Sequence, residues 1–133
     1  MQLKSAVTAG VVALGIIGAG AGGAAAGAFT HSTTGGNING NYQFLPRGTV
    51  QGAFNWWGTV DDTSNEGNAM KMQVRVEGYG YNTYRNPVDT DKYWDQYLYD
   101  GAAQTTNIAR AKICRDRGSL YPDNCSAEKT YYR

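Results

Sequence analysis

The chain has 133 residues, with 12 Lys and Arg against 11 Asp and Glu, and a formal net charge of +1. This balance argues against a nucleic-acid-binding protein and against a polybasic membrane-binding protein, because both need an excess of positive charge. The length suits one domain with a modest core. Proteins and glycans therefore remain the expected partners.

The first 28 residues have the three parts of a secretory signal peptide. Lys4 gives a basic start, Ala6–Ile17 is a charge-free apolar run, and Ala26-Gly27-Ala28 is an A-x-A cleavage site. Cleavage after Ala26 fits as well. We therefore expect a secreted, extracellular protein whose mature chain begins near Phe29.

A membrane anchor is the alternative for this N-terminal segment. Residues 5–30 carry no charge, which is long enough to cross a bilayer. However, Gly and Ala bury little apolar surface, and the strongly apolar part has only about a dozen residues, the length of a signal-peptide centre. We expect no stable membrane insertion after cleavage.

Removal of residues 1–28 takes away Lys4 alone among the charged residues, so the remaining 105 residues have zero net charge. All 16 aromatic residues lie in this part, which favours β structure and is also typical of binding surfaces. Cys114 and Cys125 are the only cysteines. In an exported chain an even count predicts a disulfide, and closing this short loop stabilises the fold by about 3 kcal/mol.

Phe29–Asn41 is rich in Gly, Asn and Thr, and we expect a flexible N-terminal arm there, followed by a single small β domain over residues 42–133. Tyr42–Leu45 begins the first expected strand. Thr49–Val60 is rich in aromatic and β-branched residues and reads as a strand interrupted at glycines.

The clearest element is Ala69–Tyr81, where apolar and polar residues alternate with a period of two. Met70, Met72, Val74 and Val76 share one face of this expected half-buried antiparallel strand, and we expect Gly78 and Gly80 to continue that face.

The remaining elements complete an all-β prediction. Asn82–Asp91 is an expected loop, and Lys92–Tyr99 is either a strand or a short helical turn. Thr105–Cys114 is a strand with Ala109, Ala111 and Ile113 inward, and Ser126–Arg133 adds a last short strand. The fold class is a small antiparallel β-sandwich or partly closed barrel with one disulfide.

Catalytic chemistry has little support in the residue inventory. His31 is the only histidine and lies in the expected arm, where nothing holds it against a nucleophile, so we interpret it as a solvated linker residue. We therefore predict a non-enzymatic protein with no catalytic residues and no cofactor.

Two weaker chemical hypotheses remain. Paired carboxylates for glycoside hydrolysis could come from Asp61, Asp62 and Glu66, from Asp89 and Asp91, or from Asp95 and Asp100. Asp61-x-Thr63-x-Asn65-x-Gly67 has some likeness to a calcium loop, but its glycine is one place late and no acidic residue closes it. We predict no metal site.

Trp56-Trp57 is the most suggestive binding feature, because neighbouring side chains on a strand face opposite sides. One tryptophan enters the core, and the other, near Asn55 and Gln51, faces solvent or a partner, or lies under a loop. The candidate binding surface is formed by Trp56, Trp57, Tyr79, Tyr81 and Trp94.

The tail carries a resemblance to a known group of proteins. Ala111–Ser126 reads A-K-I-C-R-D-R-G-S-L-Y-P-D-N-C-S. It resembles the C-terminal stretch of small exported actinobacterial proteins, some of which look like the adaptor subunit of umbrella toxin particles. In those assemblies a small β protein joins a lectin-like subunit to a large stalk-bearing toxin subunit. The resemblance implies an adaptor without chemistry of its own.

The leading hypothesis is thus a secreted protein-interaction module, an adaptor of a secreted antibacterial toxin assembly, whose N-terminal arm pairs with a sheet edge of its protein partner. The alternatives are a glycan-binding module of the cell envelope and a stand-alone toxin or hydrolase inhibitor. An inhibitor would use Arg115–Pro122 within the disulfide loop.

Overall fold

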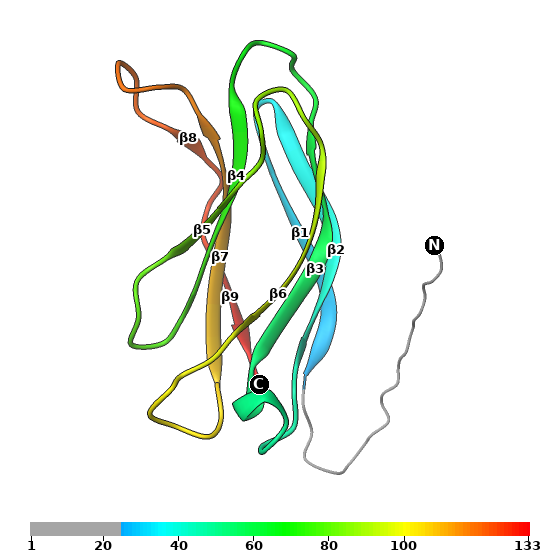
Figure 1. The fold of residues 1–133 in the computed structure, drawn as a ribbon, viewed down its shortest axis with the longest axis vertical. Helices are drawn as coiled ribbons and strands as arrows, with labels where there is room; N and C mark the ends of the chain where they lie inside the picture. Colours follow the sequence, from blue (N-terminus) through cyan, green and yellow to red (C-terminus); the bar gives the residue numbers. More distant parts are fainter. Residues whose placement is uncertain (1–24) are drawn as a thin grey trace.

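The computed structural model describes residues 25–133 as two antiparallel β-sheets packed face to face (Figure 1). Sheet A has the order β1-β2-β3-β6, and sheet B has the order β5-β4-β7-β8, with β9 also paired to β7. The strands are β1 (Ala26–Thr33), β2 (Gly36–Phe44), β3 (Phe54–Asp62), β4 (Ala69–Val76), β5 (Asn82–Arg85), β6 (Lys92–Leu98), β7 (Ile108–Asp116), β8 (Asn124–Cys125) and β9 (Lys129–Tyr132). The all-β prediction is confirmed, and the architecture is a sandwich.

The two strands with the clearest alternation form the centre of sheet B. In β4, Met70, Met72, Val74 and Val76 are buried, as the period-two pattern predicts. Its neighbour β7 buries Ala109, Ala111 and Ile113 against the same core, and the expected last strand is present as β9. Small alanines on β7 leave room for larger side chains arriving from sheet A.

The expected flexible arm over Phe29–Asn41 is wrong. These residues form most of the β1–β2 hairpin, closed by the two-residue turn Thr34-Gly35, in which Gly35 has φ 94°. Phe29 and Ile38 are fully buried, and the glycines and asparagines between them mask the alternation. The β domain therefore begins at β1 and not at residue 42.

The predicted signal peptide lies mostly outside the described residues. Its last residues, Ala26–Ala28, pair with Asn41–Gln43 at the start of β1. Cleavage after Ala28 would therefore remove the first three residues of this strand, whereas cleavage after Ala26 would remove one.

Three further boundaries differ from expectation. β3 begins at Phe54 because Val50 and Gln51 have positive φ in a short 3₁₀ turn. β4 ends at Val76, since Gly78 takes φ 85° in the following turn. The expected loop over Asn82–Asp91 contains strand β5. The next segment, expected to be either a strand or a short helical turn, forms strand β6 over Lys92–Leu98.

An aromatic cluster fills the space between the sheets. Phe29 from β1 stacks on Trp56 from β3 with ring centroids 5.3 Å apart, and it also contacts Tyr131 from β9 at 5.4 Å. Burial of each large side chain stabilises the fold by about 1.5–3 kcal/mol. The core is formed by Phe29, Ile38, Phe44, Phe54, Trp56, Val60, Met70, Met72, Val74, Val76, Leu98, Ala109, Ala111, Ile113 and Tyr131.

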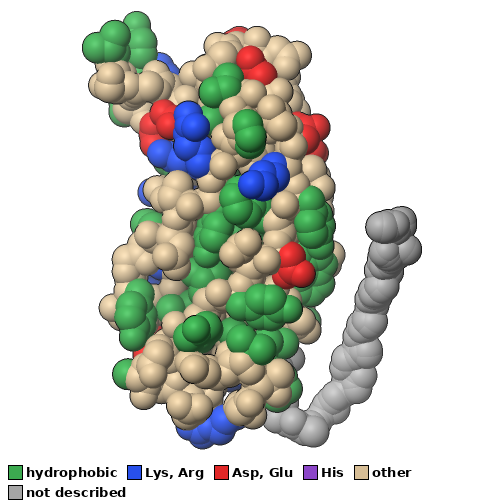
Figure 2. Space-filling model, viewed as in Figure 1, with side chains coloured by type: hydrophobic (Ala, Val, Ile, Leu, Met, Phe, Trp, Pro, Cys, Tyr) green, Lys and Arg blue, Asp and Glu red, His purple; other side chains and the backbone are tan. Residues whose placement is uncertain are grey.

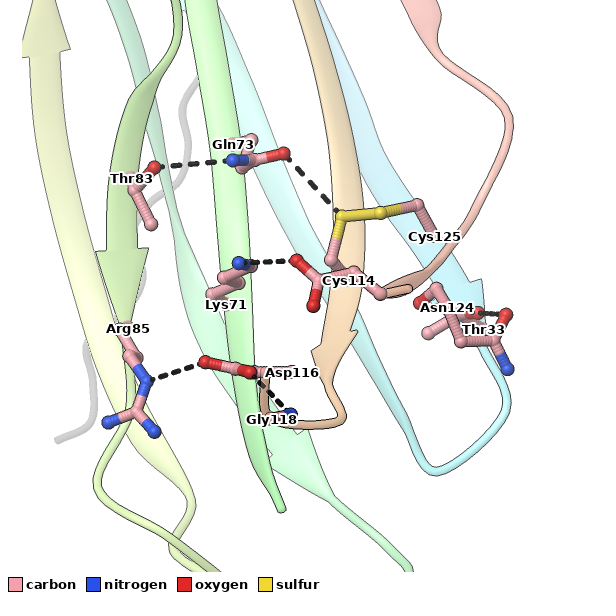
Figure 3. A network of polar contacts seen from close by, with 11 residues as sticks. Thr33, Lys71, Gln73, Thr83, Arg85, Cys114, Asp116, Gly118, Asn124 and Cys125 are labelled. Carbon is pink, nitrogen blue, oxygen red and sulfur yellow. Dashed lines mark hydrogen bonds and ion pairs between the residues drawn. A yellow bond between two sulfur atoms is a disulfide. The ribbon is translucent and has the colours of Figure 1, made fainter. Parts of the chain in front are cut away.

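The predicted disulfide is present between Cys114 on β7 and Cys125 on β8, and Figure 3 shows it beside Gln73 of β4. Cys114 is buried, and Thr33 of β1 donates a hydrogen bond to the Asn124 backbone oxygen at 3.3 Å. The bridge therefore anchors the C-terminal tail where β8 meets the end of the first hairpin.

Two facing glycines let β2 and β3 approach closely. A Cβ atom on Gly40 would lie 2.0 Å from the Trp57 carbonyl oxygen, and one on Gly58 would lie 2.9 Å from the Gly40 Cα atom. Backbone atoms cannot move aside as a flexible side chain can. Only glycine therefore fits at residue 40 without separating the two strands.

We expect Gly40→Ala to lower the free energy of unfolding by about 1–3 kcal/mol, because the added methyl group forces β2 away from β3. Urea unfolding followed by tryptophan fluorescence measures this change. Gly80→Ala is the matched control, since a Cβ there meets nothing within 4 Å. Equal stability of the two variants would contradict the close-approach argument.

Candidate binding surface

The outer faces of the two sheets differ sharply in charge. On sheet B the outward side chains include many Lys and Arg residues, most of them paired with acidic groups. Lys71 lies 2.6 Å from Asp123, and Arg85 lies 3.2 Å from Asp116. Figure 3 draws the pair of Arg85 and Asp116. This pattern is typical of a solvated face whose ion pairs contribute little to stability.

The outer face of sheet A carries no Lys or Arg, and its charged groups are the carboxylates of Asp95 and of Asp61, which is opposite Asn37 at the end of β3. It presents amides from β2, a tryptophan and polar residues from β3, and two tyrosines from β6. We call this set the amide–aromatic face, and it consists of Asn37, Asn39, Asn41, Gln43, Asn55, Trp57, Thr59, Tyr93, Asp95 and Tyr97. Asp95 is the one charged residue in the set.

Strand register places these side chains in rows across the sheet. Asn41 on β2 is opposite Trp57 on β3, and Trp57 is opposite Asp95 on β6. The next row contains Gln43, Asn55 and Tyr97. Since successive strands lie about 4.8 Å apart, each row brings three side chains within reach of one ligand.

A hydrogen-bond chain fixes the centre of the face. Gln43 Nε2 donates to Asn55 Oδ1 at 3.0 Å, and Asn55 Nδ2 donates to Asp95 Oδ1 at 2.7 Å. The same Asn55 amide donates to the Gln96 backbone oxygen at 2.9 Å. Only 3% of Asn55 is exposed, so it acts from below the surface to orient Gln43 and Asp95.

The aromatic rings lie on either side of this chain. Tyr93 is 58% exposed and Tyr97 is 47% exposed, whereas Trp57 is half-buried between β2 and β6. Partial burial and the Asp95 carboxylate between them raise the pKa of both tyrosines. Their hydroxyl groups therefore stay protonated at neutral pH and can donate hydrogen bonds.

The five residues predicted as a binding surface do not come together. Trp56 is fully buried and Trp57 lies on the outer face, which confirms the expected opposite orientation but removes Trp56 from any surface. Tyr79 donates to Asp100 Oδ1 at 3.1 Å in a turn, and Tyr81 lies against Arg75 and Lys112 of sheet B.

Trp94 lies at the seam between the sheets, where β6 meets β5. Its Nε1 donates to Asn86 Oδ1 at 2.9 Å, and its ring packs on Tyr84. Figure 2 shows hydrophobic side chains gathered along the middle of this view, between the two sheets. Trp94 therefore closes the core at this edge and does not belong to the amide–aromatic face.

Sequence reasoning missed most of this face, although a signal was present. Asn37, Asn39, Asn41 and Gln43 alternate with inward residues at a period of two, and so do Tyr93, Asp95 and Tyr97. The first pattern was concealed by its Gly and Asn content, which also fits a loop.

Of the carboxylates in the sequence hypotheses, Asp95 lies on the amide–aromatic face and Asp61 lies at its margin, opposite Asn37. The loops and turns hold Glu66, Asp89, Asp91 and Asp100. Burial and the nearby Asp91 raise the pKa of Asp61, and Asp91 Oδ1 accepts a hydrogen bond from the Asp62 backbone N–H at 2.8 Å. Asp100 accepts hydrogen bonds from the Tyr79 hydroxyl and the Ala102 backbone N–H. It therefore stabilises a turn and does not form a pair with Asp95. Within residues 25–133 no three His, Cys, Asp or Glu side chains are arranged to hold a metal ion.

The histidine expected in a solvated linker is instead a core residue, so that interpretation is wrong. His31 on β1 is 3% exposed, and its Nε2 lies 2.9 Å from the Tyr131 hydroxyl. Burial, with a smaller contribution from the Lys129 charge, lowers its pKa to about 4. His31 is therefore neutral at physiological pH.

Comparisons of this chain with protein-family models, with curated proteins and with solved structures give no match. Over residues 25–133 the structure contains no helix long and apolar enough to cross a membrane. The resemblance of the tail to adaptor subunits stays a prediction.

We expect His31 to make the fold sensitive to acid. Its pKa is about 4 in the folded state and 6.5 in the unfolded state, so the unfolded state binds the proton first as pH falls. Stability contributed by the neutral ring is complete above pH 6.5 and falls by about 3 kcal/mol as the pH drops to 4.

The measurement is urea unfolding between pH 7 and pH 4 for the parent protein and for His31→Gln. Carboxylates titrate in both proteins, so the difference between the two curves isolates the histidine. Parallel curves over this range would show that the pKa of His31 is the same in the folded and unfolded states, and would contradict the prediction.

Proposed function

We propose that this protein is an exported, non-enzymatic binding module that binds an uncharged carbohydrate on the amide–aromatic face of sheet A. The observation that carries the proposal is the arrangement of Trp57, Tyr93 and Tyr97 around the hydrogen-bonded amides of Gln43 and Asn55, on a sheet face without Lys or Arg. The opposite sheet carries the charged surface.

The chemistry of the face complements a sugar. Each Asn or Gln side chain offers a donor and an acceptor, and the Asp95 carboxylate offers acceptors only, which together match hydroxyl groups that both donate and accept. Aromatic rings supply flat apolar area for the C–H face of a sugar ring. Asn55 holds Gln43 and Asp95 in place, so little side-chain entropy is lost on binding.

The carboxylates of Asp95 and Asp61 determine which ligand charge this side of sheet A favours. Asp95 would repel a uronic acid or a phosphorylated glycan, and the face contains no Lys or Arg to offset it. An uncharged polymer is therefore the favoured ligand class.

A protein partner is the second candidate, and it corresponds to the adaptor hypothesis. Depletion of charge with enrichment of Tyr and Trp is also typical of the centre of protein–protein interfaces. The face nevertheless has no Leu, Ile, Val, Met or Phe to fill a pocket on a partner, and the side chains that β2 contributes to it are all amides. These features favour the carbohydrate.

We expect the double variant Tyr93→Ala/Tyr97→Ala to weaken carbohydrate binding at least tenfold, because it removes both exposed rings of the face. The probes are soluble cello-, chito-, manno- and β-1,3-gluco-oligosaccharides. Titration calorimetry measures the affinity after an array has identified the strongest of them.

The double variant Tyr121→Ala/Tyr132→Ala is the matched control, because those tyrosines are 60% and 63% exposed but lie outside the face. We expect it to bind as the parent does. Equal losses in both variants, or a parent that binds none of the four glycan classes, would contradict the proposal.

A further inference from the structure

The outer edge of β1 offers unpaired backbone groups. Among the described residues β1 pairs with β2 alone and ends sheet A. The Phe44 N–H donates to the Ala25 oxygen at 2.8 Å, which extends this ladder by one residue. Because bonded residues alternate in an antiparallel pair, the backbone groups of Ala28, Thr30 and Ser32 point away from β2. The Lys129 ammonium, which donates to the Thr30 oxygen, lies on that outer side.

The β1 strand itself carries none of the features that normally block strand pairing, and among residues 25–133 the one charged group at its edge is the Lys129 ammonium on the Thr30 oxygen. Proteins protect exposed edges with charged residues, prolines or short strands. At the other edges, β6 carries Lys92 and Asp95, while β5 and β9 have only four residues each. By contrast, β1 has eight residues, AGAFTHST, with no proline and no Asp, Glu, Lys or Arg. Cleavage after Ala26 would leave seven of them, and cleavage after Ala28 would leave Phe29–Thr33, which is still longer than β5 or β9.

A shallow groove runs beside this edge. Its volume is about 440 Å³, and it is lined by residues of β1 and β2 together with Ser126, Ala127 and Lys129. Its lining consists mainly of hydroxyl and amide groups, with Lys129 as its one Lys, Arg, Asp or Glu residue. The groove thus joins a row of backbone donors and acceptors to a single cationic side chain.

We propose that an extended segment of a partner protein adds to sheet A along β1, and that an acidic side chain of this segment pairs with Lys129. The main-chain bonds to Thr30 and Ser32 give affinity, and the ion pair selects the register of the added strand. Lys129 itself is exposed, so its ammonium can leave the Thr30 oxygen when the new strand arrives.

Charge complementarity favours a different protein over a second copy of this chain. Pairing of β1 with β1 of another copy would bring no carboxylate from that strand to Lys129, since β1 contains none. Strand addition by a partner also differs from the pairing expected from the sequence, in which residues 29–41 of this chain were the added segment.

The test uses the full chain and a displayed library of random twelve-residue peptides. Thr30→Pro removes one outward N–H and leaves the β1–β2 bonds in place, whereas Thr30→Ser retains that N–H. We expect selected peptides to bind Thr30→Pro at least tenfold more weakly than the parent and to bind Thr30→Ser within twofold. We also expect them to be enriched in Asp and Glu, with an affinity that Lys129→Gln lowers several-fold.

Amide hydrogen exchange on the parent protein provides a readout that does not depend on the variants. In the free protein we expect Thr30 and Ser32 to exchange faster than Phe29 and His31, and peptide binding should slow Thr30 and Ser32. The proposal is overturned if no peptide is selected, if selected peptides bind Thr30→Pro as tightly as the parent, or if they leave the exchange at Thr30 and Ser32 unchanged. Slow exchange there in a homodimer without peptide would overturn it in favour of a second copy.

Discussion

Burial of the aromatic cluster between the two sheets is the constraint on which the rest of the structure depends. Phe29 must reach Trp56 and Tyr131 for the sandwich to close, and each of these residues comes from a different strand. Because strand side chains alternate, fixing the inward set also fixes the outward set. Trp57 is on the surface because Trp56 is in the core, and the amides of β2 face outward because Ile38 and Phe44 face inward.

This coupling explains which parts of the fold could be predicted. β4 was clear because Met, Val and charged residues alternate over eight positions, and β7 was clear because Arg110 and Lys112 separate its buried residues. The first hairpin could not be recognised, because its inward positions include Gly36, Gly40 and His31 as well as Phe29 and Ile38. A glycine or histidine carries little hydrophobic signal, although each here has a definite packing role.

The alternation of side chains along a strand also explains why only part of the candidate site could be predicted. The sequence showed that one tryptophan of the pair would face outward, but it could not show that β6 would lie beside β3 and bring Tyr93 and Tyr97 to that tryptophan. Strand order depends on contacts between residues about 40 positions apart, and no local pattern encodes them. Tyr79, Tyr81 and Trp94 looked equally suitable as aromatic residues, yet turn geometry and the inward orientation of Trp94 place them elsewhere.

The amide–aromatic face and the groove beside β1 are continuous. Asn37 and Asn39 belong to the amide–aromatic face and also line the groove beside β1. A strand added at β1 would become the fifth strand of sheet A, and every second side chain of it would extend the same outer face. A partner bound at the edge would therefore enlarge the proposed carbohydrate surface without displacing Trp57 or the β6 tyrosines, which lie on β3 and β6, toward the other edge of the sheet. In this arrangement the proposed carbohydrate-binding face and the proposed protein-binding edge would coexist on one small domain, which is the minimum that an adaptor between a protein and a glycan requires.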